Sequence, residues 1–403
     1  MKNSSIFGIL TLTLALMPSH FGWAMNFEVH PGIYTAFEYS DNYFGRSHDI
    51  QSESTYEVGP SLGLRWQTPI FSFDLASRLA KSLHRKFHED DSTEAEIASH
   101  ATLSRTHQKV GLIYEYLQTR WRGSLAEPPG LLRRNTGGAN YAWEMTQKAT
   151  LSLGYAYTDY NWREPHEDEK TQDGNINLTY LLTPRNTIDL AYRYEYYDYQ
   201  ISQDVRVLNT NLAWLYAVTS RLHLGFTSRY TKEERGDLPN EDIYDLSALG
   251  RFSITENTRF SATGGQSWLV MEQQDRQSIY IMSASLEHAF DQDKLAVDVS
   301  RGYTAEFTTN LYGIYDTKTA LLTGEKVLLR TLKGVVQIAI EKTKPTAGTV
   351  GEKETDTVAR ASLIWDPIEY VTATAIYEHL QHENEISDTV RENRYRMVVE
   401  ARY

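Results

Sequence analysis

The 403-residue chain contains no cysteine and only 11 prolines. The absence of cysteine excludes a disulfide scaffold, a thiolate metal site, a cysteine nucleophile and a lipid-modified N-terminal cysteine. Past the first 24 residues no run of apolar residues approaches a length of 18, so a helical membrane protein is excluded as well. The acidic balance, with a formal net charge of −13 and no basic run, argues against nucleic acid as a partner.

The chain nevertheless has a high content of side chains that need burial or an apolar surrounding. Hydrophobic residues make up 41% and aromatic residues 12%, with 27 tyrosines and 8 tryptophans. This content excludes a disordered chain, because disordered segments are poor in aromatic and apolar residues. Together with a mean hydropathy of −0.49, it indicates apolar residues that are dispersed among polar ones.

The first segment reads as a secretory signal peptide. Lys2 gives a weakly positive start, Ile6 to Met17 form an apolar stretch, and Gly22-Trp23-Ala24 places small residues at the two positions that a signal peptidase inspects. We therefore predict a signal peptide at residues 1–24 and a second unit at residues 25–403 that leaves the cytoplasm.

From residue 26 onward, apolar residues recur at every second position, the period of a half-buried strand. Leu151, Leu153, Tyr155 and Tyr157, for example, alternate with small or polar residues. Counting such segments predicts 20 strands, at 27–39, 54–66, 70–82, 94–105, 109–120, 136–145, 148–160, 172–182, 186–199, 205–217, 221–232, 242–254, 258–271, 276–290, 294–307, 312–322, 326–342, 354–365, 370–381 and 391–403.

The predicted connections alternate between short turns and longer charged loops. Turn residues occur at Thr183-Pro184-Arg185, Thr323-Gly324-Glu325 and Asp366-Pro367-Ile368, whereas 163–171 and 344–353 are long. This alternation is typical of an outer-membrane barrel whose two rims face different compartments. We therefore predict an all-β fold, a transmembrane up-and-down antiparallel β-barrel of about 20 strands (18–20). A soluble β-sandwich is the alternative, but its strands would be shorter.

Aromatic residues near the strand ends suit the two interfacial girdles of a membrane barrel. Those expected there are Tyr39, Trp66, Trp121, Trp143, Tyr160, Tyr180, Tyr199, Trp214, Tyr230, Trp268, Tyr303 and Trp365. The last strand ends on Tyr403 after apolar residues at every second place, which resembles the signal that outer-membrane assembly machinery reads. Outer-membrane lipid and this machinery are therefore the first expected partners, and the bacterial outer membrane is the expected location.

The alternation also predicts which side chains line the lumen, because a charge on the lipid face is costly. The candidates are Arg65, Arg78, Arg193, Arg229, Arg251, Arg259, Arg360, Arg396, Glu57, Asp74, Glu115, Glu195 and Asp245. Both signs are present, so they predict no strong ion selectivity. Tyr34 also faces inward and would offer a surface on which a sugar could stack. Residues 118–135 and 308–313 are candidates for loops that fold into the lumen, although external loops are the simpler interpretation.

A resemblance to a known family rests on the N-terminal region. The sequence reads His30-Pro31-Gly32-Ile33, then Glu38-Tyr39-Ser40-Asp41-Asn42-Tyr43-Phe44, with Val58-Gly59-Pro60-Ser61-Leu62 and Leu64-Arg65-Trp66-Gln67-Thr68-Pro69 after them. This resembles the outer-membrane β-barrel porin family found with exopolysaccharide and capsule secretion systems. The resemblance implies an outer-membrane channel or accessory component for export of an extracellular polysaccharide, with periplasmic polysaccharide-export proteins as partners.

The residues of this sequence that match the first-strand motif of that family have no assigned role there; they are Glu38, Tyr39, Asp41 and Asn42. In this sequence, Asp-Asn after a strand is also a good turn former, which by itself explains the pair.

We expect neither enzymatic activity nor a cofactor or metal site. His84, His88, Glu89, Asp90 and Asp91 cluster in one predicted external loop, but a solvated charged loop is the simpler interpretation. His100 and His223 each face inward alone. Two further functions remain open besides polysaccharide export: a general diffusion porin for small solutes, and a non-conducting surface or adhesion barrel that acts through its loops.

Overall fold

The computed structural model describes residues 26–121, 130–163, 168–200, 203–236, 238–271, 276–307, 312–346, 352–385 and 389–402. They form one 20-stranded antiparallel sheet. The strands are β1 (Asn26–Ser40), β2 (Glu53–Gln67), β3 (Phe71–His84), β4 (Ser92–Arg105), β5 (Gln108–Trp121), β6 (Gly130–Thr146), β7 (Ala149–Arg163), β8 (Glu169–Thr183), β9 (Asn186–Tyr199), β10 (Val205–Ala217), β11 (Leu222–Arg235), β12 (Leu238–Ser253), β13 (Thr258–Met271), β14 (Gln277–Phe290), β15 (Asp293–Phe307), β16 (Tyr312–Leu329), β17 (Leu332–Pro345), β18 (Glu354–Ile368), β19 (Val371–Asn384) and β20 (Val390–Arg402).

A 3-10 helix, η1 (His88–Asp90), lies between β3 and β4. Within the described part of the chain, no helix is long and apolar enough to cross a membrane.

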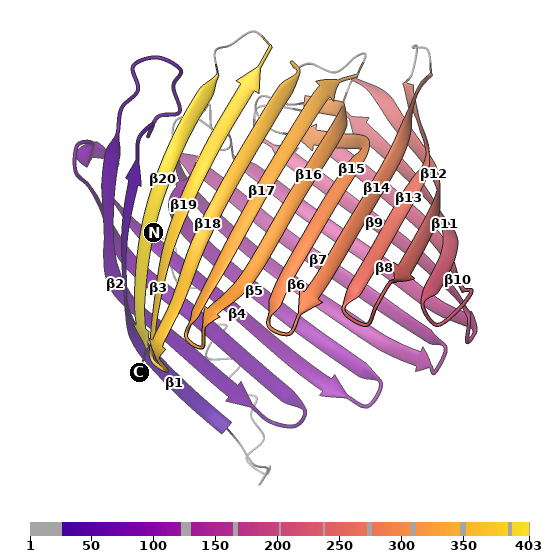
Figure 1. Cartoon of the computed structure of the whole chain (residues 1–403), viewed down its shortest axis with the longest axis horizontal. Coiled ribbons are helices and arrows are strands. Elements are labelled where there is room, and N and C mark those ends of the chain that lie inside the picture. Colours follow the sequence, from indigo (N-terminus) through magenta and orange to yellow (C-terminus); the bar gives the residue numbers. More distant parts are fainter. Residues whose placement is uncertain are drawn as a thin grey trace.

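The sheet closes on itself where the first strand meets the last. Each strand pairs with the next along the chain, and β1 pairs with both β2 and β20, from Gly32 opposite Arg402 to Ser40 opposite Arg394. Residues Asn26–Pro31 of β1 extend past the end of β20 and pair with β2 alone. Figure 1 shows the resulting cylinder, with tight turns at its lower rim and longer connections at its upper rim. The predicted fold class is confirmed.

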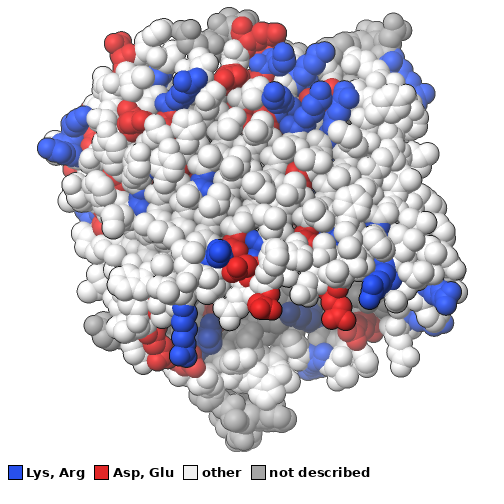
Figure 2. All heavy atoms as spheres, in the orientation of Figure 1, with Lys and Arg blue, Asp and Glu red and all other residues white. Residues whose placement is uncertain are grey.

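The two faces of each strand differ as the alternation predicts. On β1, Ile33 is 58% exposed on the outside, whereas the next residue, Tyr34, is 3% exposed on the inside. On β20 the outward Met397 is 59% exposed. Because consecutive side chains point to opposite faces, a single register places the alternating apolar residues of a strand on one side. In Figure 2 most of the visible outer face is uncharged, and charged residues gather toward the rims.

The strands are longer than a membrane crossing needs. They contain 13 to 18 residues, against roughly 9–11 for a tilted crossing, so their ends extend beyond the lipid on both sides.

Three of the strands predicted from the sequence, 186–199, 205–217 and 258–271, begin and end at the predicted residues.

Two predicted turns are wrong. Gly324 lies inside β16, where it pairs with Leu295 and Val336, and the turn falls at residues 330–331. Likewise Pro367 belongs to β18, at an irregularity between Trp365 and Ile368, and the turn falls at residues 369–370. In both cases neighbouring strands offer hydrogen-bonding partners beyond the turn-forming residues, and a strand irregularity tolerates a proline that cannot donate.

Part of the predicted aromatic girdle is wrong as well. Tyr160 and Tyr199 share the inward face with Arg134 and Glu169, their register partners, and Tyr303 is buried inside the barrel. The side chain of Trp121, the predicted signal peptide and Tyr403 lie outside the described residues. The outer face does carry aromatic pairs, Tyr377–Tyr395 at the middle of β19 and β20 and Tyr230–Tyr244 in the upper half of β11 and β12, each with ring centroids 5.0 Å apart. The second pair suits an interfacial girdle.

Candidate functional site: a polar lumen narrowed by a hairpin

The inner wall of the barrel carries many charged residues, most of them in cross-strand pairs. The register places on the inward face Arg65, Arg78, Arg193, Arg229, Arg251, Arg259, Arg360, Arg396, Glu57, Asp74, Glu115, Glu195 and Asp245. Antiparallel register partners point to the same side, so opposite charges on neighbouring strands come within reach of each other.

Most of the inward arginines are ion-paired. The simple pairs are Arg65–Asp74 (3.0 Å), Arg78–Glu96 (3.3 Å), Arg134–Glu115 (3.3 Å), Arg229–Asp245 (2.6 Å), Arg360–Glu378 (3.4 Å) and Arg402–Glu400 (2.8 Å). Three arginines contact two carboxylates each: Arg193 with Asp173 and Glu195, Arg235 with Glu233 and Glu241, and Arg396 with Glu57 and Glu38. At these three places the wall carries excess negative charge.

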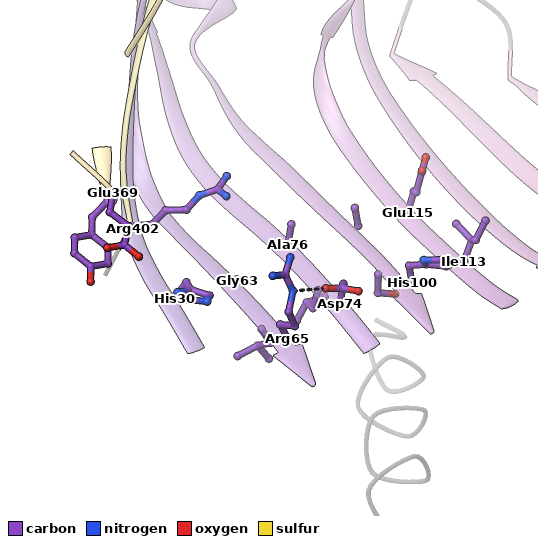
Figure 3. Close-up of a pocket in the computed structure, with 15 residues that line it drawn as sticks. His30, Gly63, Arg65, Asp74, Ala76, His100, Ile113, Glu115, Glu369 and Arg402 are labelled. Atoms are coloured by element: carbon purple, nitrogen blue, oxygen red, sulfur yellow. Dashed lines mark hydrogen bonds and ion pairs between the residues drawn. The ribbon is translucent and has the colours of Figure 1, made fainter. Parts of the chain in front are cut away.

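One end of the lumen is shown in Figure 3. Arg65 and Asp74, joined by the dashed line, point into a cavity of about 690 Å³ that His100 and Glu115 also line. His100 faces inward, as predicted, opposite Asp74. On the far side of the same rim, His223 lines a second cavity with Arg251 and Arg259, which form no ion pair with any described residue. Water-accessible side chains of both signs therefore surround this mouth.

Tyr34 is not a free stacking surface, so that prediction is wrong. Its hydroxyl donates to Glu57 Oε2 at 2.9 Å, and Nη2 of Arg396 lies 3.0 Å from the same hydroxyl. The guanidinium of Arg78 covers the ring, 4.1 Å from its centroid. The arrangement ties β1, β2, β3 and β20 together on the inside, because one tyrosine is surrounded by charged partners from three other strands.

The upper ends of β15 and β16 curl into the lumen (Figure 1), while β16 stays paired with β17 up to Tyr315 opposite Pro345. The pairing of β15 with β14 stops at Arg301 opposite Met282, although β14 continues upward to Gln277. Above this point β15 pairs with β16 alone. Residues 301–307 and 312–318 are called here the inturned hairpin; residues 308–311 lie outside the described residues.

The packing of Tyr303 shows that the hairpin bends toward the inside of the barrel. Tyr303 is in phase with residues of β15 that face lipid lower in the wall, yet it is 4% exposed. It forms a cluster with Ile314 of β16 and with Ile243, Leu269 and Met271, which lie on the inward faces of β12 and β13. The outer face of the hairpin therefore lies against the inner wall. Burial of these apolar side chains is the driving force that holds it there.

An ion pair stiffens the hairpin near its base. Arg301 donates from Nε and Nη2 to the two carboxylate oxygens of Asp316, at 3.0 and 2.7 Å. Such a two-point contact fixes the relative position of the two strands. Arg301, Tyr303 and Thr317 line a polar cavity of about 830 Å³ in the lumen, together with Arg229 of β11 and Asp245 of β12. The hairpin thus narrows the passage next to charged residues.

The marker residues of the N-terminal motif lie where β1 pairs with β20, which is called here the closing seam of the barrel. Glu38 faces inward next to Arg396, and Tyr39 faces outward with its ring centroid 6.2 Å from that of Tyr395. Asp41 accepts hydrogen bonds from the backbone N–H and the side-chain amide of Asn393, each at 2.7 Å.

Asn42 is 1% exposed and continues this seam into the loop after β1. Its side-chain amide donates to the carbonyl oxygens of Arg391 and Arg46, at 2.7 and 2.8 Å, and its Oδ1 accepts from the Arg46 N–H. These residues form more than a turn: they fasten the first strand to the last.

The histidine and acidic residues at the end of β3 and in the loop after it are held in place by a hydrogen bond and an ion pair. Asp91 accepts from the backbone N–H of His84 at 2.7 Å, and Asp90 pairs with Arg120 at 2.8 Å. None of these residues belongs to a group with metal-ligand spacing among the described residues. Such a group does occur elsewhere, at Glu354, Asp356 and His382, which the sequence pattern did not single out because it comes from separate strands.

Comparison with known proteins bears on the fold. No protein-family model matches the chain, and no curated protein does, so the resemblance to the exopolysaccharide-associated family has no support there. Among solved structures, a mutant of the ferric enterobactin receptor PfeA from Pseudomonas aeruginosa is 10% identical, with a TM-score of 0.50 over 93% of this chain and 80% of that one.

Two further solved structures also match over nearly their whole length. OccK5 (OpdH) from Pseudomonas aeruginosa is 12% identical over 93% of this chain and 98% of that one, with a TM-score of 0.47. A BenF-like porin from Pseudomonas fluorescens Pf-5 is 10% identical over 95% of this chain and all of that one, with a TM-score of 0.46.

At these identities the similarity concerns the fold. The closed cylinder, its apolar outer belt and its polar interior define the chain as a 20-stranded β-barrel of the bacterial outer membrane.

Proposed function

We propose that this protein is a diffusion porin through which small water-soluble solutes cross the outer membrane. The observation that carries the proposal is the inturned hairpin: the barrel narrows its own polar lumen with a chain segment packed on the inner wall. An 18-stranded porin already encloses an aqueous channel, and pore diameter together with the lining polar groups decides what passes.

The wall chemistry supports small polar solutes. Ion pairs line the lumen from one mouth to the other, and the inward tyrosine nearest the seam, Tyr34, is covered by Arg78 and hydrogen-bonded to Glu57. Small solutes exchange hydration water for such groups without needing an extended sugar-binding surface. Polysaccharide export, which the N-terminal motif implied, gains no comparable support from the lumen.

Permeation measurements test the proposal. The refolded protein is inserted into liposomes, and swelling rates are recorded with an amino acid, a monosaccharide and oligosaccharides of increasing length, while planar bilayers report conductance. We expect conductance and rapid entry of the small solutes, with entry falling steeply as the chain length of the sugar grows. A barrel that neither conducts nor admits small solutes would contradict a porin function. Preferential passage of long polysaccharide, with loss of secreted polysaccharide in a deletion strain, would instead favour export.

A further inference from the structure

A group of inward side chains at the upper ends of β16 to β19 has the composition of a metal site. The register sets Asp356 of β18 opposite His382 of β19 and Glu341 of β17, and sets Glu354 of β18 opposite Thr343 of β17. The potential ligand atoms of Glu354, Asp356 and His382 all lie within 4.8 Å of one another. Two neighbouring strands, β18 and β19, thus deliver the three potential ligands to one place.

The charges in this group are not balanced by the protein. His382 Nδ1 lies 2.8 Å from Asp356 Oδ1, and this is the one ion pair that the group makes among the described residues. Neither Glu341 nor Glu354 forms one, and the nearest inward arginine along β18, Arg360, is paired with Glu378. One imidazole therefore faces three carboxylates. Burying carboxylates without a countercharge is costly, which favours a bound cation.

Unpartnered buried oxygens beside the carboxylates give an independent indication. Thr343, the register partner of Glu354, is 3% exposed, and its Oγ1 makes no hydrogen bond. Thr317, opposite Thr343 on β16, is 6% exposed and its Oγ1 also lacks a partner. Glu354, next to these hydroxyls, is 9% exposed. Buried polar groups are nearly always satisfied, so such a concentration calls for an ion.

We propose that Glu354, Asp356 and His382 bind a divalent transition-metal ion of the Zn²⁺ class, with the Thr343 hydroxyl beside it. Imidazole together with carboxylates suits Zn²⁺ better than Mg²⁺ or Ca²⁺, which take oxygen ligands alone. Metal–ligand bonds of about 2.0–2.2 Å place tetrahedral ligands roughly 3.3 Å apart. His382 and Asp356 thus separate slightly, and Glu354 moves in as the third ligand. Asp356, whose side chain is 45% exposed, gives access from the lumen.

The site departs from the sequence-based expectation that the chain has no metal. Its role would be structural. An ion held by β18 and β19 would fix these two strands to each other at the upper rim, where the connections between strands are longest. It is independent of the proposed transport function.

Metal titration of the refolded, tag-free barrel in detergent tests the proposal. We expect one equivalent of Zn²⁺ per chain by calorimetry, and Co²⁺ at the same site with the visible absorption of a tetrahedral complex. Glu354→Gln, Asp356→Asn and His382→Gln each reduce the affinity at least about tenfold, as expected for loss of one of three ligands. Glu383→Gln is the matched control, since Glu383 is exposed and follows His382 on the opposite face of β19.

Folding of each variant is verified by circular dichroism and by heat-modifiable electrophoretic mobility, so a lost site is distinguished from a lost barrel. Absence of Zn²⁺ binding by the native chain overturns the proposal. Binding that persists unchanged in all three ligand variants overturns it too, because the ion would then occupy another site.

Discussion

The carboxylate of Asp41 is fastened to Asn393, 352 residues away along the chain, by two hydrogen bonds of 2.7 Å. The Asp41 N–H in turn donates to the Asn393 carbonyl oxygen at 3.1 Å. Asp41 follows the first strand and Asn393 lies in the last, so these contacts close the cylinder at its upper rim. A side chain that the sequence explains as a turn former therefore joins the two ends of the sheet.

Replacing Asp41 will weaken this closure. We expect Asp41→Ala to lower the free energy of unfolding by about 2 kcal/mol, because a charged acceptor is lost and two donors of Asn393 lose their partner. Equilibrium unfolding in guanidinium, with the barrel in lipid vesicles, measures the effect. Glu89→Ala, an exposed acid in the neighbouring external loop, serves as the control. Equal stability of the two variants would show that the seam does not depend on Asp41.

Loosening the inturned hairpin will widen the pore. In the double variant Tyr303→Ala, Ile314→Ala the hairpin loses two buried side chains of its contact with β12 and β13. We expect single-channel conductance to rise about twofold or to become noisy, because pore diameter sets conduction. Tyr280→Ala controls for the loss of a tyrosine, since Tyr280 is 77% exposed on the outside of β14. Conductance that stays at the native value would place the narrowest point elsewhere.

The two carboxylates around Arg193 predict that the proposed pore prefers cations, contrary to the sequence-based expectation of no strong ion selectivity. Arg193 lies between Asp173 and Glu195, so this site keeps one uncompensated negative charge. We expect a reversal potential in a salt gradient that indicates cation permeability above anion permeability, and a preference that fades at molar salt as screening shortens to about 3 Å. Asp173→Asn should reduce the preference, and Arg193→Gln should increase it. An unchanged reversal potential in both variants would mean that this wall does not face the permeation path.

Two consecutive residues of β9, one pointing outward and one inward, test which face of the strand contacts lipid. Leu190 is 43% exposed on the outside, whereas Ala191 lines the lumen opposite Asn177 and Asn211. Leu190→Arg should destabilise the barrel by about 2–4 kcal/mol, the cost of arginine on the lipid face near the bilayer midplane. Ala191→Arg should leave stability nearly unchanged, because the lumen is wet. The refolding yields and unfolding midpoints of the two variants in vesicles show which of the two positions faces lipid.

The strands, their number and their inward and outward faces follow from local pattern. Alternation in segments such as 186–199 needs no knowledge of distant residues, because consecutive side chains on an extended backbone point to opposite sides. The wrong turns at Gly324 and Pro367 mark the limit of this reasoning. Whether a turn-forming residue ends a strand depends on whether neighbours on both sides still offer hydrogen-bonding partners, and that is a property of the sheet.

By itself the sequence determined that this chain is a 20-stranded membrane barrel with a charged interior, since a two-residue period of hydrophobicity is a local property. Only the tertiary structure decided that Tyr303 turns inward, that Asp41 meets Asn393, and that Glu354 and His382 share one site. Each of these depends on which residues of different strands stand opposite one another. That register results from closing the whole sheet, so no single segment contains it.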